Sequence, residues 1–199
     1  MNTSNTENTH QAEVVYESKG CTPAGTPFMS VKRARGYYEY AERGGQDSIF
    51  FVLYDKMTDK FALIYESKPP MDERENREVR MCTAFGGSID MGDDYCNIEI
   101  CQTEVAEETG YEVAIERITS VGKSLVSTQM SQMAEGFFVD VTGIPKTLEA
   151  EYEKAASEAQ AEKDANEFSG NDVLWLSKEE VLANGDWKSI YVIAKYFGL

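Results

Sequence analysis

The sequence predicts an α/β fold, and three observations lead to this prediction. The chain has 199 residues, enough for one domain with a sizeable core. Its first half contains short aromatic and β-branched runs separated by Gly, Pro, Asp and Asn, which is typical of strands. Later segments carry apolar residues at helical spacing. We therefore expect one mixed α/β domain over residues 14–199, preceded by a polar, disordered tail at residues 1–13.

Strands dominate the first part of the chain. The strands predicted here cover residues 13–19, 27–43, 47–55, 60–68 and 81–87. Residues 55–60, DKMTDK, predict a hairpin loop between two of these strands. Residues 69–80, PPMDERENREVR, are polar and charged and therefore predict another loop.

The remainder of the chain alternates strands with helices. Strands are predicted at residues 116–127, 135–143 and 171–177. Alanine and glutamate are dense between residues 147 and 165, which favours a helix there. Residues 178–199 predict one or two helices, with an apolar face formed by Ile190, Ile193, Ala194 and Phe197.

The charge balance limits the partners. Nineteen basic and 35 acidic residues give a net charge of −16, which disfavours nucleic acid and anionic membranes and attracts divalent cations. No apolar run approaches the roughly 20 residues that cross a bilayer, and the first 13 residues lack the features of a signal peptide. We expect a cytoplasmic protein with no membrane partner, and we expect its four cysteines to be reduced.

The chain contains a single histidine, His10, which lies in the predicted tail. A Ser-His-Asp or Cys-His catalyst, or a histidine-rich zinc site, would require His10 to fold back into a pocket. The sequence therefore favours chemistry based on carboxylates and hard metal ions.

A helix is predicted at residues 98–109, ended by Gly110 in the left-handed conformation that favours glycine. At about 100° per residue, Ile98, Cys101 and Val105 share one face of this helix and anchor it in the core. This position gives Cys101 a packing role rather than a redox role.

Three glutamates, Glu104, Glu107 and Glu108, gather on another face of the same helix. Like charges at this spacing repel one another unless an opposite charge lies nearby. Carboxylates one turn apart suit Mg²⁺ or Mn²⁺, which take further ligands from water and from substrate phosphates. The alternative is a solvated acidic face with no ligand, because such faces are common.

The loop before the helix, FGGSIDMGDD, resembles the start of the Nudix box, the signature of hydrolases that act on nucleoside diphosphates linked to another moiety. The box would cover residues 87–111. The family pattern is Gly, five residues, Glu, seven residues, Arg-Glu, aliphatic, any residue, Glu-Glu, any residue, Gly, aliphatic. The residues that match it are Gly87, Glu104, Val105, Glu107, Glu108 and Gly110.

The chain departs from the box at four points. Asp93 replaces the first Glu, nine residues rather than seven separate it from Thr103, Thr103 replaces the Arg, and Tyr111 replaces the last aliphatic residue. In the family the Arg helps to orient a box glutamate. The extra residues fit in the loop, whereas the lost Arg implies a differently supported metal site.

Residues 28–199 are similar to the ADP-ribose pyrophosphatase branch of the family. The resemblance implies a Nudix α/β/α sandwich with a mixed sheet and additional amino-terminal antiparallel strands. It implies that Mg²⁺, with Mn²⁺ as a substitute, is held by Glu104, Glu108 and the Gly86 carbonyl, with Glu107 as a catalytic residue. The reaction implied is hydrolysis of a phosphoanhydride to two monophosphates.

The general base in that branch is commonly an acidic residue on a loop after the sheet. Glu167 is the preferred candidate, with Asp164 and Glu162 as alternatives, because Glu167 directly precedes the last predicted strand. A flexible acidic loop with no role is the competing interpretation.

Substrate contacts are less specific. Arg74, Arg77 and Arg80 could hold a phosphate or ribose, although exposed loop salt bridges explain them equally simply. Tyr38, or its neighbours Tyr37 and Tyr40, could stack a base, although aromatic residues are also common in strands.

Several functions stay open. A small-molecule nucleotide substrate is expected, with ADP-ribose first and UDP-sugars or other nucleotide sugars next. A Nudix-fold module that binds a nucleotide without hydrolysing it is favoured by the Asp and Thr replacements in the box. RNA decapping fits poorly with the overall charge. Relatives in this branch are often dimers built through their amino-terminal strands, so a homodimer is expected.

Overall fold

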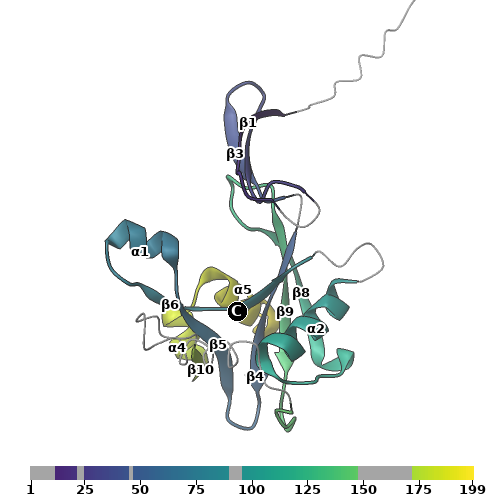
Figure 1. Ribbon diagram of the computed structural model, residues 1–199. Coiled ribbons are helices and arrows are strands. Elements are labelled where there is room, and N and C mark those ends of the chain that lie inside the picture. The colour runs from purple at the N-terminus through teal and green to yellow at the C-terminus, as the bar shows by residue number, and fades with distance from the viewer. Residues whose placement is uncertain (1–11, 22–24, 45–46, 90–95, 148–171) are drawn as a thin grey trace, which may run out of the picture. The chain divides into compact units, whose positions relative to one another are not determined.

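The computed structural model in Figure 1 describes residues 12–21, 25–44, 47–89, 96–147 and 172–199. The chain divides into two compact units. The amino-terminal unit covers residues up to Asp47 together with Leu125–Met133, and the sheet unit covers Ser48–Ser124 and Ala134–Leu199. The predicted tail and most of the helix predicted at 147–165 lie outside the described residues.

The amino-terminal unit contains a three-stranded antiparallel sheet in the order β1-β2-β3. Its strands are β1 (Glu13–Glu17), β2 (Ser30–Ala34) and β3 (Tyr38–Glu42). The additional amino-terminal antiparallel strands are therefore confirmed. The predicted strand at 27–43 is divided by a turn at Arg35 and Gly36, where both residues have positive φ angles.

The sheet unit is built on a seven-stranded mixed sheet with a central path β10-β5-β4-β9-β8. Its strands are β4 (Ser48–Asp55), β5 (Lys60–Ser67), β6 (Arg80–Thr83), β7 (Phe85–Ser88), β8 (Ile118–Leu125), β9 (Met133–Asp140) and β10 (Asp172–Leu176). β4 pairs parallel with β9, while β5 pairs antiparallel with β4, β6 and β10. The described helices of this unit are α1 (Pro69–Glu75), α2 (Asn97–Thr109), α4 (Lys178–Asn184), α5 (Trp187–Phe197) and a 3₁₀ turn at Ile115–Arg117.

The sheet forks where β4 and β5 diverge. β4 pairs with β5 through Leu53–Asp55 but with β7 through Ser48–Phe51. β6 pairs with β5, so the chain passes from one strand to the other at Ala84. This crossing brings Gly86 and Gly87 into the sheet beside the start of β4.

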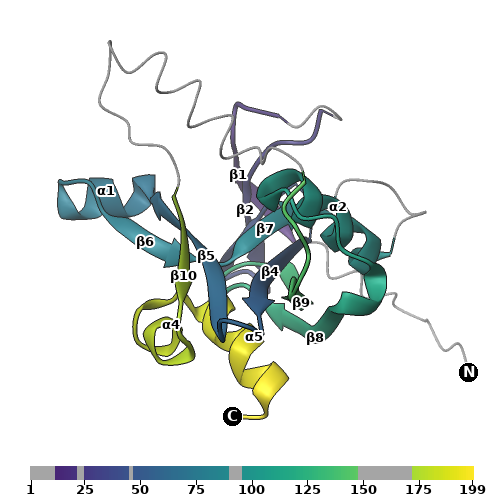
Figure 2. The same ribbon diagram turned by 90° about the horizontal axis from the view of Figure 1, so that it is seen from below.

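Helices cover both faces of this sheet (Figures 1 and 2). Residues of α2 pack with the odd-numbered residues of β4 in one core cluster that includes Ile49, Phe51, Phe85, Phe137, Ile100, Cys101 and Val105. On the opposite face, Phe50 contacts Trp187 and Tyr191 of α5, with ring centroids 5.7 and 6.1 Å apart. The predicted α/β/α arrangement with a mixed sheet is confirmed.

One predicted loop is a helix. Residues 69–80 contain α1, because Pro69 and Pro70 occupy its first turn, where their fixed φ favours helix and their missing N–H groups cost nothing. Asn76 ends the helix with a φ of 51°. The Asp72 carboxylate accepts hydrogen bonds from the Val79 backbone N–H and the Ser67 hydroxyl, at 2.5 and 2.6 Å. The two prolines and the hydrogen bonds at the helix ends therefore favour a helix here, although the polar composition predicted a loop.

The predicted apolar face of the last helix was wrong in part. The buried residues of α5 are Ser189, Val192 and Ile193, whereas Phe197 is exposed over 40% of its surface. Phe197 nevertheless packs edge-on against the rings of Tyr54, Phe61 and Phe138. Tyr196 also stacks on Phe138 of β9, so aromatic contacts with the sheet orient the helix.

All four cysteines are free, as expected, with Cys82 and Cys101 buried and Cys21 and Cys96 exposed. Among the described helices, none combines the length and apolar character that a membrane span requires.

Candidate active site

The α2 helix forms where the sequence predicts it, at Asn97–Thr109 rather than 98–109. At its amino end, the Glu99 carboxylate accepts a hydrogen bond from the Cys96 backbone N–H at 3.0 Å. Gly110 ends the helix with a φ of 75°, and the predicted left-handed cap is confirmed. Ile100, Cys101 and Val105 are fully buried, which fixes the rotation of the helix on the sheet.

Glu104 lies directly against the backbone of Gly87. A Cβ atom added to Gly87 would lie 2.1 Å from Oε1 and 2.7 Å from Cγ of Glu104. Real Cβ atoms do not approach other atoms so closely, so only glycine allows the carboxylate to lie here. The first glycine and a central glutamate of the box, 17 residues apart in the sequence, are thus in contact in the fold.

The other two box glutamates differ in exposure. Glu108 lies one turn after Glu104, is half-buried, and has a buried Oε2 atom. Glu107 is exposed to solvent. Glu104 and Glu108 therefore share a partly desolvated side of α2, whereas Glu107 points to water.

Gly86 directly precedes Gly87 in β7. It is exposed and pairs with Phe50, and a Cβ atom on it would lie 3.1 Å from the Ile49 carbonyl oxygen. Because Phe50 faces α5, the missing side chain of Gly86 lies on that face, and only Gly87 makes room for α2.

Glu135 is a carboxylate that the sequence analysis missed. It lies in β9 opposite Ile49, and Ile49 also lies opposite Gly87, so Gly87, Ile49 and Glu135 form one row across the sheet. Residues that lie opposite one another share a face, which is here the α2 face. The sequence feature that could have identified Glu135 is a charged residue next to the aromatic run of a predicted strand.

Glu135 is held in place by neighbouring donors. Its carboxylate accepts hydrogen bonds from the Asn97 amide and the Ser120 hydroxyl, both at 2.6 Å. Its side chain is 15% exposed, and Lys123 Nζ lies 3.8 Å from it. Burial raises the pKa of the Cys101 thiol, and the carboxylates of Glu104 and Glu135 raise it further, so both carboxylates lie near this thiol.

Thr103 occupies the position of the family Arg. Its hydroxyl donates to the Glu99 carbonyl oxygen at 3.1 Å, one turn earlier on α2. A short side chain bonded to its own helix cannot orient a carboxylate as the Arg does.

The predicted arginines lie on α1, just after its end and at the start of β6, away from the glutamates in sequence. Arg74 has a side chain that is 73% exposed and pairs with Glu75 at 3.5 Å, and Arg77 is exposed after the end of α1. Their roles in substrate binding stay predictions.

Arg80 faces away from α2. It pairs with Ser67, three residues after Ile64, whose side chain packs against the core beneath α2. An odd separation along a strand places side chains on opposite faces. Arg80 Nη2 donates to the Tyr65 carbonyl oxygen at 2.8 Å, and the guanidinium lies 4.6 Å from the centre of the Tyr65 ring.

Tyr38 belongs to the amino-terminal unit. Its hydroxyl donates to the Thr128 carbonyl oxygen of the same unit at 2.6 Å, and 42% of the residue is exposed. Base stacking by Tyr38 stays a prediction. Asp93 and the candidate bases Glu162, Asp164 and Glu167 lie outside the described residues.

The donor chemistry at α2 suits a hard cation. Glu104 and Glu108 offer carboxylate oxygens one turn apart, and the backbone beside Gly87 offers a carbonyl oxygen. Within the described ranges, no three Asp, Glu, Cys or His side chains converge closely enough to hold a metal ion. A bound Mg²⁺ would therefore depend on water or substrate phosphates for much of its coordination, as this ion commonly does.

Comparison with solved structures identifies the fold. The crystal structure of an ADP compounds hydrolase is similar with a TM-score of 0.55 and 14% sequence identity, over 94% of this chain and 91% of that chain. A NUDIX hydrolase from Nitrosomonas europaea, at 17% identity, covers 77% of this chain with a TM-score of 0.48. The E. coli ORF135 protein, at 15% identity, covers 77% of this chain with the same TM-score. No family model and no curated protein matches the chain.

The sheet order, the helices on its two faces and the similarity to the ADP compounds hydrolase define a protein of the Nudix fold. Within that fold, Glu104 of α2 and Gly87 of β7 meet at the segment that resembles the Nudix box.

Proposed function

We propose that this protein is a Mg²⁺-dependent hydrolase that cleaves the phosphoanhydride of a nucleoside diphosphate linked to another moiety. The observation that carries the proposal is the contact of Glu104 with Gly87, which joins the first glycine of the box to a glutamate of its helix. A partly buried Glu108 one turn away and the nearby Glu135 strengthen the negative potential there. Such a potential attracts a divalent cation rather than a free phosphate.

Glu104 and Glu108, with the Gly86 carbonyl, would hold the metal ion. When bound, Mg²⁺ supplies neutralisation of the diphosphate and activation of a water nucleophile. Glu107, which faces solvent, would act on that water or on its orientation, and Glu167 is proposed as the general base.

ADP-ribose is the proposed substrate, and nucleotide sugars such as UDP-glucose are the alternatives. One similar solved structure is that of a hydrolase of ADP compounds, which supports a substrate that contains adenosine diphosphate linked to another moiety. The resemblance of residues 28–199 to the ADP-ribose pyrophosphatase branch supports the same choice.

Phosphate release, coupled to a phosphatase, tests the proposal with ADP-ribose, UDP-glucose, NADH, diadenosine polyphosphates and dNTPs, with and without Mg²⁺. Glu104→Gln and Glu108→Gln should each lower kcat by orders of magnitude, because each removes a charged metal ligand. Glu116→Gln, at an exposed position outside α2, is the matched control and should leave the rate unchanged. Full Mg²⁺-dependent activity in the Glu104→Gln/Glu108→Gln double variant would refute the metal site.

A nucleotide-binding module without hydrolysis is the second candidate. The Asp and Thr replacements in the box favour it, and Thr103 is bonded to its own helix. Calorimetry with ADP-ribose separates the two functions. Saturable binding without product in the presence of Mg²⁺ would identify the module, whereas product formation excludes it.

The proposal includes a homodimer formed through the amino-terminal unit. All five residues of β1 are exposed, and large apolar side chains of this unit are open to solvent: Val14, Val15, Tyr16, Phe28 and Met29 are between 44 and 55% exposed. Contiguous exposed apolar residues mark interaction surfaces.

Light scattering should give twice the mass of the 22.3 kDa chain, and Val15→Lys should shift the measured mass toward that of the monomer. A monomer at micromolar concentration would contradict the dimer.

A further inference from the structure

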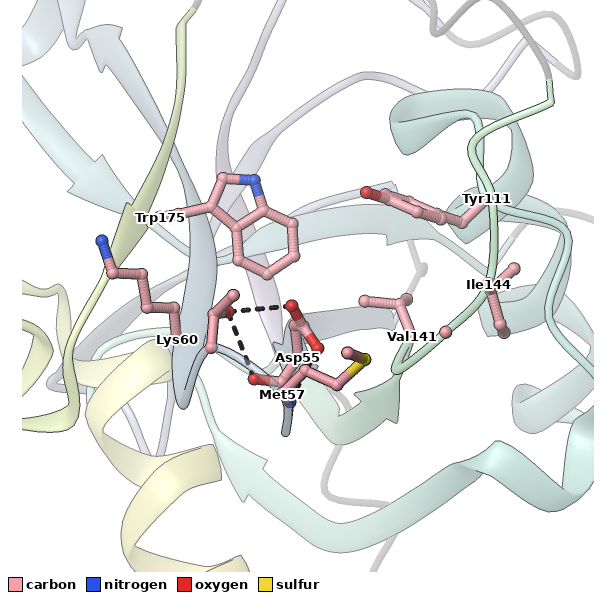
Figure 3. A pocket seen from close by; sticks show the side chains of 9 residues that line it. Asp55, Met57, Lys60, Tyr111, Val141, Ile144 and Trp175 are labelled. Carbon is pink, nitrogen blue, oxygen red and sulfur yellow. Dashed lines mark hydrogen bonds between the residues drawn. The ribbon is translucent and has the colours of Figure 1, made fainter.

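A cavity of about 330 Å³ lies at the end of the sheet unit remote from Gly87, and Figure 3 shows it from close by. Trp175 of β10 and Tyr111, which follows α2, lie on opposite sides of the space. Asp55, Met57 and Lys60, from the turn that joins β4 to β5, form its lower rim. The volume is at the lower end of the range for small-molecule sites.

The cavity is separate from the box glutamates. Gly87 lies opposite Ile49 near the start of β4, whereas Asp55 is the last residue of that strand. Six residues separate Ile49 from Asp55, which corresponds to roughly 20 Å at about 3.3 Å per residue. Both positions are odd-numbered and share the α2 face, so the cavity opens on the same face but at the other end.

The two rings suit a flat ligand. Trp175 and Tyr111 are both half-buried and both pack against the core cluster, so the core fixes their positions while part of each ring stays open. Val141 is buried between them at the floor of the cavity. Planar heteroaromatic rings stack well on such aromatic faces.

Tyr111 is also one of the departures from the box. The family pattern has an aliphatic residue at this position, which would offer no aromatic face. Here the replacement places a phenol ring in the wall of the cavity. Tyr111 has no evident role at the box glutamates, but it forms part of the wall of this cavity.

The rim adds polar recognition without net charge. The Asp55 carboxylate accepts hydrogen bonds from the Met57 backbone N–H at 2.9 Å and the Thr58 hydroxyl at 2.8 Å, which fix its orientation. Each carboxylate oxygen keeps a second lone pair for a ligand donor. Lys60 lies opposite Asp55 in the β4–β5 pairing and offers a donor. One acid and one base favour a neutral polar ligand over an ion.

We propose that this cavity is a second binding site, separate from the box glutamates, that takes a purine base or nucleoside between Trp175 and Tyr111. The base packs against the Trp175 ring, Tyr111 closes the opposite side of the space, and the amino group of the base donates to Asp55.

The chain's two tryptophans, Trp175 and Trp187, provide the test. Trp187 packs on Phe50 on the opposite face of the sheet, so Trp187→Phe leaves Trp175 as the sole indole reporter. Adenosine is titrated into this variant without Mg²⁺, so that the readout does not depend on hydrolysis. We expect saturable quenching of Trp175 fluorescence in the micromolar to millimolar range. AMP, in a parallel titration, shows whether a phosphate adds to the binding of the nucleoside.

Tyr111→Leu in the same background restores the aliphatic residue of the family pattern and is expected to fold. It should weaken adenosine binding about 5- to 150-fold, the value expected for the loss of one aromatic contact with a base. Tyr37→Leu, at a tyrosine of the amino-terminal unit that is 75% exposed, is the matched control and should bind normally.

The proposal is overturned by an absence of saturable quenching up to millimolar adenosine, or by equal affinity in Tyr111→Leu. Should Tyr111→Leu lose its native circular dichroism, Asp55→Asn is the second variant, and unchanged discrimination between adenosine and inosine would then overturn the proposal. Binding of adenosine by a catalytically inactive protein would still support it, so the two proposals fail independently.

Discussion

At the residue scale, the candidate site depends on the absence of a side chain. The Glu104 carboxylate lies where a Cβ atom of residue 87 would be, so glycine at this position sets where the carboxylate can lie. The neighbouring Gly86 has a different constraint, the Ile49 carbonyl oxygen at 3.1 Å from a Cβ atom. The two glycines are therefore not interchangeable.

Gly87→Ala should lower turnover far more than it lowers the stability of the folded protein. The added methyl group forces the Glu104 side chain to swing away, because Oε1, Cδ and Cγ would all lie within 2.7 Å of it. We expect a stability cost of about 1–3 kcal/mol and a far larger loss of turnover. Urea unfolding and the coupled phosphate assay measure the two effects. In Gly87→Ala/Glu104→Ala the stability should recover, and additive stability costs would show that the methyl group clashes elsewhere.

Thiol reactivity tests the burial of α2. Burial raises the pKa values of the Cys82 and Cys101 thiols, so these thiols stay protonated and unreactive at neutral pH. Cys21 and Cys96 are exposed. A chromogenic disulfide reagent at pH 8 should therefore modify two thiols rapidly in the native protein and four in guanidinium. Rapid reaction at Cys101, identified by peptide mass, would contradict the packing of α2 on the sheet.

At the element scale, the crossing of the chain from β6 to β7 is fixed by the start of α5. Ala84 lies between the two pairings, and its N–H donates to the Asp186 carboxylate at 3.2 Å. Asp186 also caps α5 by accepting from the Ser189 backbone N–H at 2.9 Å, and its own N–H donates to the Cys82 carbonyl oxygen at 3.1 Å. Thus α5, which lies on one face of the sheet, helps to position β7. The strand β7 in turn carries Gly86 and Gly87 to the part of β4 where α2 packs on the opposite face.

Asp186→Ala should therefore cost more than the loss of an ordinary helix cap. Loss of the cap costs about 0.5–2 kcal/mol, and leaving the Ala84 N–H without its acceptor adds about 1–3 kcal/mol. Ser177→Ala is the matched control, because Ser177 caps α4 by accepting from the Glu180 backbone N–H at 3.2 Å and makes no contact with the crossing. Equal changes in the free energy of unfolding for the two variants would show that Asp186 acts only as a cap.

At the scale of the whole molecule, the sequence predicted elements with strong local signals and missed contacts made across the fold. The α2 helix was predictable because its apolar spacing and Gly110 agree with its burial. Glu135 was not, because its place in the site follows from the parallel pairing of β9 with β4, which joins residues 86 positions apart. The orientation of Arg80 was hidden for the same reason, since strand register decides which face it occupies.

The net charge of −16 makes the folded state sensitive to cations, and Mg²⁺ should stabilise it through two separable effects. General screening of repelling carboxylates is reproduced by NaCl at equal ionic strength. Binding at Glu104 and Glu108 adds a further increment, about 2.7 kcal/mol at a concentration one hundred times Kd, because the ion binds only the folded state there. Thermal unfolding with MgCl₂ or matched NaCl should therefore show a Tm increase specific to Mg²⁺ that EDTA reverses. The Glu104→Gln/Glu108→Gln variant should lose this specific increase while keeping the response to NaCl. If both proteins respond equally to the two salts, the acidic face of α2 is a solvated surface, and the metal would have to arrive with the substrate.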